Sequence, residues 1–185
     1  MDEKESRLVE LVLKGHSEAF EPLVTPYRRT LLNMAFRLSR NWEDAKEISQ
    51  ETLLRAFRYL RSYDLERSFK NWLLQILINV WRSTQKKKLE PEKLAELAAE
   101  NRESNPLEVH LRGEIRSQVL ACLEGLTTRE KEVFLLRDLE EMSIKETARI
   151  LRASPISVRV RLSTARKKVR ERIQEKFPHL LEGRR

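Results

Sequence analysis

The C-terminal part of the chain carries closely spaced cationic side chains, whose chemistry suits the binding of nucleic-acid phosphates. In the segment SPISVRVRLSTARKK, residues 154–168, basic and apolar residues alternate locally, which is typical of a half-buried strand. Over a longer window the apolar residues instead recur at steps of three or four, which predicts one stripe of an α-helix. That stripe consists of Val158, Leu162, Ala165, Val169 and Ile173.

The start of this segment also favours a helix. Ser154 is a favourable N-cap residue, and Pro155 at the next position has a preset φ and no amide to leave unpaired. A solvated basic face is the alternative to a binding surface, so the function of this helix depends on its context. The basic residues around it, opposed on the helix only by Glu171, are Arg159, Arg161, Arg166, Lys167, Lys168, Arg170 and Arg172.

The residues just before the basic helix predict a helix-turn-helix. The sequence SIKETARIL, residues 143–151, has Ser143 followed three positions later by Glu146, a capping box that opens a short helix. A three-residue break, 152–154, separates it from the basic helix, and Arg152 or Ala153 must take the turn position that is often Gly. In this motif the second helix enters the DNA major groove.

The 100° turn per residue of a helix sorts the side chains of the basic helix by direction. Val160 must lie on the outer face although it is apolar, which suits contact with a thymine methyl group; a tolerated surface valine is an equal alternative. We assign Arg159, Val160, Ser163 and Thr164 to base edges, and Arg161, Arg166 and Lys167 mainly to phosphates.

A second set of polar side chains lies in the first half of the chain, on a helix that Ser68 is expected to cap. These residues follow one another at helical steps and lead into the basic run 86–88. Amide side chains pair with base edges in two-bond contacts, although amides on a helix surface are also commonly just solvated. The residues are Asn71, Gln75, Asn79, Arg82 and Lys86.

The sequence contains no arrangement of residues that is typical of a catalytic site or a metal site. The three histidines, at positions 16, 110 and 179, are far apart, and Cys122 is the only cysteine, expected to pack as a small hydrophobe. The sequence has no phosphate-cradling glycine loop and no nucleophile constellation. We therefore expect no enzyme, no catalytic residues, no metal and no cofactor.

The composition indicates which kind of secondary structure positions these residues. Charged residues make up 36% of the chain and hydrophobic residues 40%, while four Gly and six Pro leave little turn chemistry. With little alternation of β-branched residues, the predicted class is all-α. No apolar run approaches the roughly 18 residues of a membrane span, and the start MDEKESRL is too charged for a signal peptide. We expect a cytoplasmic protein without membrane insertion.

Charge divides the chain into three parts. Residues 1–88 hold 17 basic and 12 acidic side chains, residues 89–109 hold 2 and 6, and residues 110–185 hold 18 and 11. The acidic stretch contains Pro91 and Pro106 and weak helical periodicity. We expect two small helical domains, 1–88 and 110–185, joined by a flexible acidic linker, 89–109.

The helices expected within these domains follow from caps and apolar stripes. The first domain is expected to contain an opening helix to about Gly15, a short turn capped by Ser17, a helix from Thr25-Pro26 to about Arg40, a helix 42–60 capped by Asn41, a loop 61–67, and the helix that follows Ser68. The second is expected to contain a helix 111–124, a helix opened by a Thr127–Glu130 capping box, and the helix-turn-helix.

The predicted buried faces are apolar stripes on three of these helices. They comprise Ala45, Ile48, Thr52, Ala56 and Leu60; then Phe69, Trp72, Leu73, Ile76, Leu77, Val80 and Trp81; and finally Val133, Phe134 and Leu136.

Three segments in this order resemble bacterial sigma factors of the small, two-domain extracytoplasmic-function (ECF) group. EDAKEISQETLLRAFRYL resembles the segment that binds the clamp helices of RNA polymerase, and SFKNWLLQILINVWRS the helix that opens and reads the minus-ten element. LTTREKEVFLLRDLEEMSIKETARILRASPISVRVRLSTARKKV resembles the domain that reads the minus-thirty-five element. The resemblance covers nearly the whole chain.

The resemblance implies partners and roles. The partners would be core RNA polymerase, promoter DNA and an anti-sigma factor, and the two domains on one linker would bind two promoter boxes together. An acidic linker suits a positively charged nucleic-acid channel. The implied polymerase-binding residues are Asp44, Glu47, Gln50, Glu51 and Leu54, and the implied minus-ten residues are Arg61, Tyr63, Asp64, Asn71, Gln75, Asn79, Arg82 and Lys86.

The chain departs from the family pattern in two places, and two other functions would explain parts of the sequence. Val160, Ser163 and Thr164 lie where relatives vary, and Pro22 and Pro26 lie in a region that is usually more continuously helical. An operator-binding regulator without polymerase explains residues 127–172 but leaves the helix with Gln50 and Glu51 and the amide stripe unexplained. A membrane-surface protein would need more exposed Trp or Phe than these faces predict.

Overall fold

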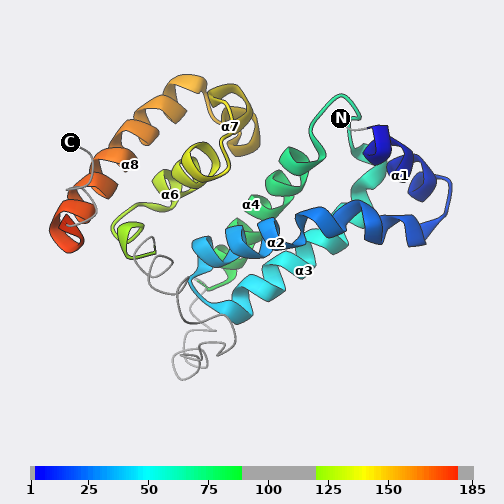
Figure 1. The fold of residues 1–185 in the computed structure, drawn as a ribbon, viewed down its shortest axis with the longest axis horizontal. Helices are drawn as coiled ribbons and strands as arrows, with labels where there is room; N and C mark the ends of the chain where they lie inside the picture. The colour runs from blue at the N-terminus through cyan, green and yellow to red at the C-terminus, as the bar shows by residue number, and fades with distance from the viewer. Residues whose placement is uncertain (1–2, 89–119, 179–185) are drawn as a thin grey trace. The chain divides into compact units, whose positions relative to one another are not determined.

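The computed structural model describes residues 3–88 and 120–178 (Figure 1). Within these ranges the chain consists of helices, turns and loops and contains no strand, which confirms the predicted all-α class. The chain divides into two compact units, residues 1–101 and 102–185. The predicted linker, residues 89–109, lies outside the described residues, so its boundaries and flexibility stay a prediction.

The first unit is a helical cluster built around three long helices, α2, α3 and α4, which run alongside and contact one another (Figure 1). Shorter elements pack at one end, and α1 contacts α2. The elements are α1 (Glu3–Leu13), the 3-10 helix η1 (Ser17–Ala19), α2 (Phe20–Ser39), α3 (Trp42–Tyr59), the 3-10 helix η2 (Leu60–Ser62) and α4 (Phe69–Lys88).

The start and inner face of α3 are as predicted. Asn41 is extended, and its side-chain oxygen accepts a hydrogen bond from the Asp44 amide at 3.0 Å, which caps the helix. The predicted stripe from Ala45 to Leu60 is buried along its whole length. This stripe fixes the rotation of α3, so the acidic residues of the helix face away from the core.

The start of α2 corrects the sequence prediction. The helix begins at Phe20, five residues before the predicted Thr25-Pro26, and Pro26 lies inside it. Pro26 has no amide to donate, but burial of Leu23 and Val24 favours the helical turn before it. Ser17 was also assigned wrongly, because it is the first residue of η1 and the N-cap is His16.

The buried face of α4 is wider than the predicted stripe. Trp72 and Ile76, predicted to be buried, are only half-buried, while Leu74 and Ile78 are fully buried. α4 is covered by both α2 and α3, so a single 3.6-residue stripe underestimates its contact surface. The remaining predicted core residues of this helix, including Phe69, are buried.

The second unit contains the predicted helix-turn-helix. Its elements are α6 (Thr128–Phe134), a π-helical segment labelled η5 (Leu135–Leu139), α7 (Ile144–Leu151) and α8 (Pro155–Lys176). Both capping boxes are present, at Thr127 with Glu130 and at Ser143 with Glu146. Arg152 takes the left-handed turn position with φ 52° and ψ 49°, and Ser154 caps α8 through the Ser157 amide at 3.1 Å.

The π-helical segment changes the register of the second unit. Leu135 is fully buried, whereas Phe134, which the sequence placed in the core, is half-buried. A π turn adds one residue to a helical turn, so the apolar residues of 135–139 are rotated relative to a regular helix. Phe134 precedes this segment, so the rotation does not account for its half-burial. The predicted helix 111–124 lies largely outside the described residues, and only residues 120–122 are seen to be helical.

Candidate nucleic-acid and protein interfaces

The helix α8 presents a basic outer face with one apolar turn. The residues Val158, Leu162, Ala165 and Val169 are buried, as predicted, whereas Ile173, the last residue of the predicted stripe, is only half-buried. Arg159, Ser163 and Thr164 are exposed, and Val160 is 61% exposed, which confirms its predicted place on the outer face. Arg161 is half-buried at the flank. The side chains assigned to base edges therefore share one accessible surface.

Arg166, which the sequence assigns mainly to phosphates, also forms an ion pair within the second unit. Its guanidinium donates two hydrogen bonds, at 2.9 and 2.5 Å, to the carboxylate of Asp138, which lies 28 positions earlier in the chain, in the π-helical segment. A two-bond guanidinium–carboxylate pair is geometrically specific, so it fixes Arg166 and ties α8 to the π-helical segment. Lys167 pairs only loosely with Glu171, at 3.9 Å and with 78% of its side chain exposed, so it stays accessible to phosphates.

A second contact holds α8 against the start of α6. The Lys168 ammonium donates to both carboxylate oxygens of Glu130, at 3.0 and 2.8 Å. The same carboxylate accepts a hydrogen bond from the Thr127 amide at 2.8 Å as part of the capping box. Burial raises the pKa of Glu130, but the hydrogen bonds from Lys168 and Thr127 lower it more, so the pKa of this carboxyl lies below its ordinary value.

This contact predicts a pH dependence of the second unit. A carboxylate whose pKa is lowered by folding stabilises the fold above its ordinary pKa, and this stabilisation is lost as the pH falls through the folded pKa. We expect the stability advantage of the native chain over Glu130→Gln to shrink as the pH falls below about 5. Gln still completes a capping box, so the variant removes the charge and keeps the cap.

The measurement for this prediction has to report on the second unit alone. All three Trp residues, at positions 42, 72 and 81, belong to the first unit, so Trp fluorescence does not serve. Hydrogen exchange of the α6 amides, compared between the two proteins at each pH, provides the local free energy of opening. An advantage that stays constant down to pH 3 would show that the Glu130 charge does not matter.

The amide stripe on α4 is accessible over most of its length. Asn79 and Lys86 are exposed, and Asn71, Gln75 and Arg82 are half-buried. They lie on one side of the helix, with the buried Leu73 and Leu77 on the other. The stripe can therefore meet a partner along α4, as the sequence predicted, and its contact with DNA stays a prediction.

The loop before α4 corrects the role of Tyr63. Its side chain is buried, its ring lies against the rings of Phe69 and Trp72, and its hydroxyl donates to the Arg67 carbonyl at 2.5 Å. Burial, with the nearby charges of Glu5 and Asp64, raises the pKa of Tyr63 to about 12. Tyr63 is thus an anchor of the loop rather than a side chain free to contact a base.

Asp64 shapes the exposed part of the same loop. One carboxylate oxygen accepts the Glu66 amide at 3.1 Å, and the other pairs with Arg67 at 3.2 Å. Asp64 and Arg61 are exposed. The loop therefore presents polar groups from a backbone that Tyr63 holds in place, which leaves both residues as candidates for base contact.

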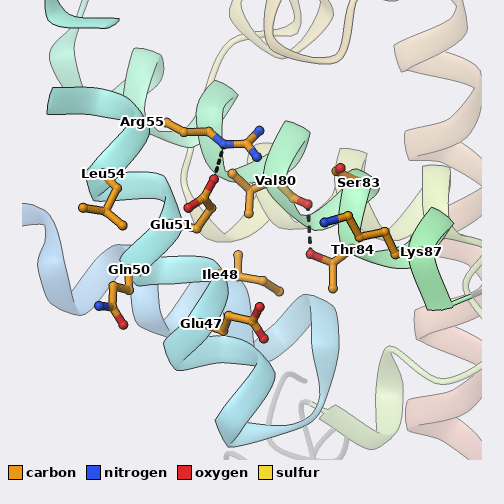
Figure 2. Close-up of a pocket in the computed structure, with 10 residues that line it drawn as sticks. All are labelled: Glu47, Ile48, Gln50, Glu51, Leu54, Arg55, Val80, Ser83, Thr84 and Lys87. Carbon is orange, nitrogen blue, oxygen red and sulfur yellow. Dashed lines mark hydrogen bonds and ion pairs between the residues drawn. The ribbon is translucent and has the colours of Figure 1, made fainter. Parts of the chain in front are cut away.

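A hollow between α3 and α4 collects most of the residues implied to bind polymerase. It has a volume of about 330 Å³ and is lined by Glu47, Ile48, Gln50, Glu51, Leu54, Arg55, Val80, Ser83, Thr84 and Lys87 (Figure 2). Asp44 is not among these residues and instead lies at the start of α3. Leu54 is 54% exposed, and Glu51 pairs with Arg55 at 2.6 Å. The hollow thus offers acidic, amide and apolar groups together.

The structure adds residues that the sequence analysis missed. Ile156, at the second position of α8, is 70% exposed, and Arg55 and Lys87 line the hollow. The helical arithmetic that placed Val160 outward also places Ile156 outward, four residues earlier, so the sequence held that signal. The pairing of Asp138 with Arg166 had no such signal.

The described residues, 3–88 and 120–178, offer neither a metal site nor a membrane span. They contain no group of three or more His, Cys, Asp or Glu placed to hold a metal ion. None of the helices in these ranges is long and apolar enough to cross a membrane. Cys122 is buried, as predicted, and burial raises its pKa.

Two family models match the chain, in the expected order. Sigma-70 region 2 matches residues 23–88, and sigma-70 region 4 matches residues 116–169. The chain is 25% identical over 183 residues to the RNA polymerase sigma-H factor of Pseudomonas aeruginosa, covering 93% of this chain and 95% of the relative. It is 29% identical over 178 residues to the ECF RNA polymerase sigma-E factor of Escherichia coli, covering 90% and 93%.

Solved structures share the fold. CnrH, in complex with the cytosolic domain of CnrY, matches with a TM-score of 0.71 at 22% identity, covering 94% of this chain and 99% of that chain. The sigma factor RpoE of Bartonella quintana, in complex with the anti-sigma factor NepR, matches with a TM-score of 0.71 at 21% identity, covering 85% and 98%. At these identities the likeness concerns the arrangement of the helices.

Proposed function

We propose which residues of this chain bind polymerase and which bind promoter DNA, from the premise that the chain belongs to the sigma-70 family as an ECF sigma factor. As an ECF sigma factor it directs RNA polymerase to promoters. The first unit binds core polymerase through the hollow between α3 and α4, and reads and helps to melt the minus-ten element through α4 and the loop before it. The second unit reads the minus-thirty-five element through α8.

One observation carries this proposal: the residues assigned to polymerase and the residues assigned to the minus-ten element lie on separate surfaces of the first unit. Glu47, Gln50, Glu51 and Leu54 gather at the hollow, whereas Asn79 and its stripe line another part of α4. An operator-binding regulator needs no hollow of this kind. A sigma factor needs one surface for polymerase and another for DNA at the same time.

Opening a duplex costs stacking and pairing energy, which a protein offsets by holding an extruded base. Asn79 is exposed on α4, and the loop from Arg61 to Arg67 is held by the buried Tyr63 and by the two contacts of Asp64. A loop that is ordered before DNA arrives loses less conformational entropy on binding. The exposed groups of Asp64 and Asn79 are the proposed contacts to an unpaired base.

An anti-sigma factor is proposed as a third partner. Two solved structures with this fold are complexes, one with an anti-sigma factor and one with a cytosolic domain. The exposed apolar side chains Leu54 and Phe57 on α3 supply a surface that a second protein can cover. A partner bound there would compete with core polymerase for Leu54.

Run-off transcription with core polymerase on genomic fragments tests the proposed function. The chain should direct initiation from a discrete set of promoters that core polymerase alone ignores. A regulator without polymerase would instead bind promoter duplex tightly by itself and add no new start sites. These two outcomes are exclusive. Run-off transcription with core polymerase, together with a measurement of promoter-duplex binding without it, therefore decides between them.

Replacing Asn79 by Ala is expected to reduce open-complex formation and relax the preference at one base position. The amide can pair with a base edge in two bonds, which contributes about 1–3 kcal/mol of discrimination. Permanganate footprinting measures the opening, and an exposed amide of the second unit, Gln174, provides the control variant Gln174→Ala. Equal affinity of Asn79→Ala and native protein for a fork template with that base already unpaired would contradict the contact.

A further inference from the structure

Two apolar side chains stand out on the basic outer face of α8. Ile156 is 70% exposed and Val160 is 61% exposed, and they are four residues apart, so they lie one above the other on the same side of the helix. Among the described residues, these two have the largest exposed fractions of any large hydrophobic side chain. Exposure of this size leaves apolar surface in water until a partner covers it.

The position of the pair indicates what covers it. Ile156 is the second residue of α8, and N-terminal residues of the second helix in a helix-turn-helix face the base edges. Arg159 lies exposed between the two, and Lys145, Arg149 and Arg152 are exposed on the preceding helix and turn. A cationic surround suits DNA, and within the major groove the one apolar group that a base edge offers is the C5 methyl of thymine.

We propose that Ile156 is a specificity-determining residue of the minus-thirty-five interaction, which contacts a thymine methyl group beside the one that Val160 contacts. The helical rise of 1.5 Å per residue separates the two side chains by about 6 Å along α8. A base step is about 3.4 Å. The pair therefore selects two A·T pairs no more than about two steps apart. This inference rests on the proposed function of α8.

Replacing single thymines by deoxyuridine tests the contact, because deoxyuridine pairs normally and lacks only the methyl group. The template is a promoter selected from a library with the native protein, and the readout is run-off transcription with core polymerase. Covering one methyl group is expected to change the rate by about fourfold. The native protein should lose this factor at two nearby positions, one for each apolar side chain.

The variants assign the two positions. Ile156→Ala should transcribe thymine and deoxyuridine templates equally at one position and keep the native response at the other, and Val160→Ala should do the reverse. The control Leu13→Ala truncates an exposed apolar side chain of α1 and should keep both responses. Because Ile156 and Val160 are exposed, their truncation leaves the core intact.

Two results would overturn the inference while leaving the proposed function standing. Ile156→Ala could retain the native methyl response at every thymine, or it could slow transcription equally on all templates, which would indicate contact with polymerase rather than DNA. Absence of promoter-dependent transcription by the native protein would instead overturn the proposed function, and this inference with it.

Discussion

The double variant Gln50→Ala/Glu51→Lys is expected to bind core polymerase on the order of thirtyfold more weakly than the native chain, about 2 kcal/mol. Both residues line the hollow between α3 and α4, next to the exposed Leu54. Reversing the Glu51 charge sets a cation beside Arg55, with which Glu51 now pairs at 2.6 Å. A partner complementary to the native hollow then meets repulsion instead of attraction.

The double variant should still fold, so weaker binding can be attributed to the changed surface of the hollow. The Glu51 and Arg55 side chains are 39% and 36% exposed, and ion pairs this accessible to water contribute only about 0–1 kcal/mol. Glu21→Lys serves as the control, because Glu21 is an exposed carboxylate of α2 that pairs with Arg28 at 2.5 Å outside the hollow. Pull-down with core polymerase, alongside circular dichroism, measures both effects. Equal binding by the double variant and the control would contradict a role of the hollow in polymerase binding.

Truncating two exposed cations of α8, Arg159 and Lys167, is expected to have contrasting effects on promoter use. Arg159→Ala should cost about 1–3 kcal/mol at the preferred promoter and relax the choice at one base position, as expected for a base contact. Lys167→Ala should weaken all sequences evenly and reduce the salt slope by about one, as expected for a phosphate contact. Arg159 is exposed on the outer face, and Lys167 is 78% exposed.

Promoter-library transcription at several salt concentrations separates the two roles. Arg129→Ala is the control, because Arg129 is an exposed cation of α6 whose loss changes the net charge by the same amount. A library profile that Arg159→Ala scales down without changing its preference would assign Arg159 to phosphates. A change of preference with Lys167→Ala would assign Lys167 to a base.

The sequence by itself determined the helices, most of their starts and the outward residues of α8. These features depend on neighbours within one or two turns: Ser143 and Thr127 cap through amides three residues away, and the rotation of α8 follows from its own apolar stripe. The place of Val160 could be predicted for the same reason. The family resemblance was equally local, resting on three segments in order.

Only the tertiary structure decided the contacts that no helical periodicity describes, whether their residues are close together or far apart in the chain. Asp138 holds Arg166 from 28 positions away, and no periodicity predicts such a pair. Tyr63 became a loop anchor because Phe69 and Trp72 surround its ring, and α2 continues through Pro26 because the turn before it is buried. Packing against several helices outweighs local propensity, since burying one large apolar side chain contributes about 1.5–3 kcal/mol and a helix cap typically about 1 kcal/mol.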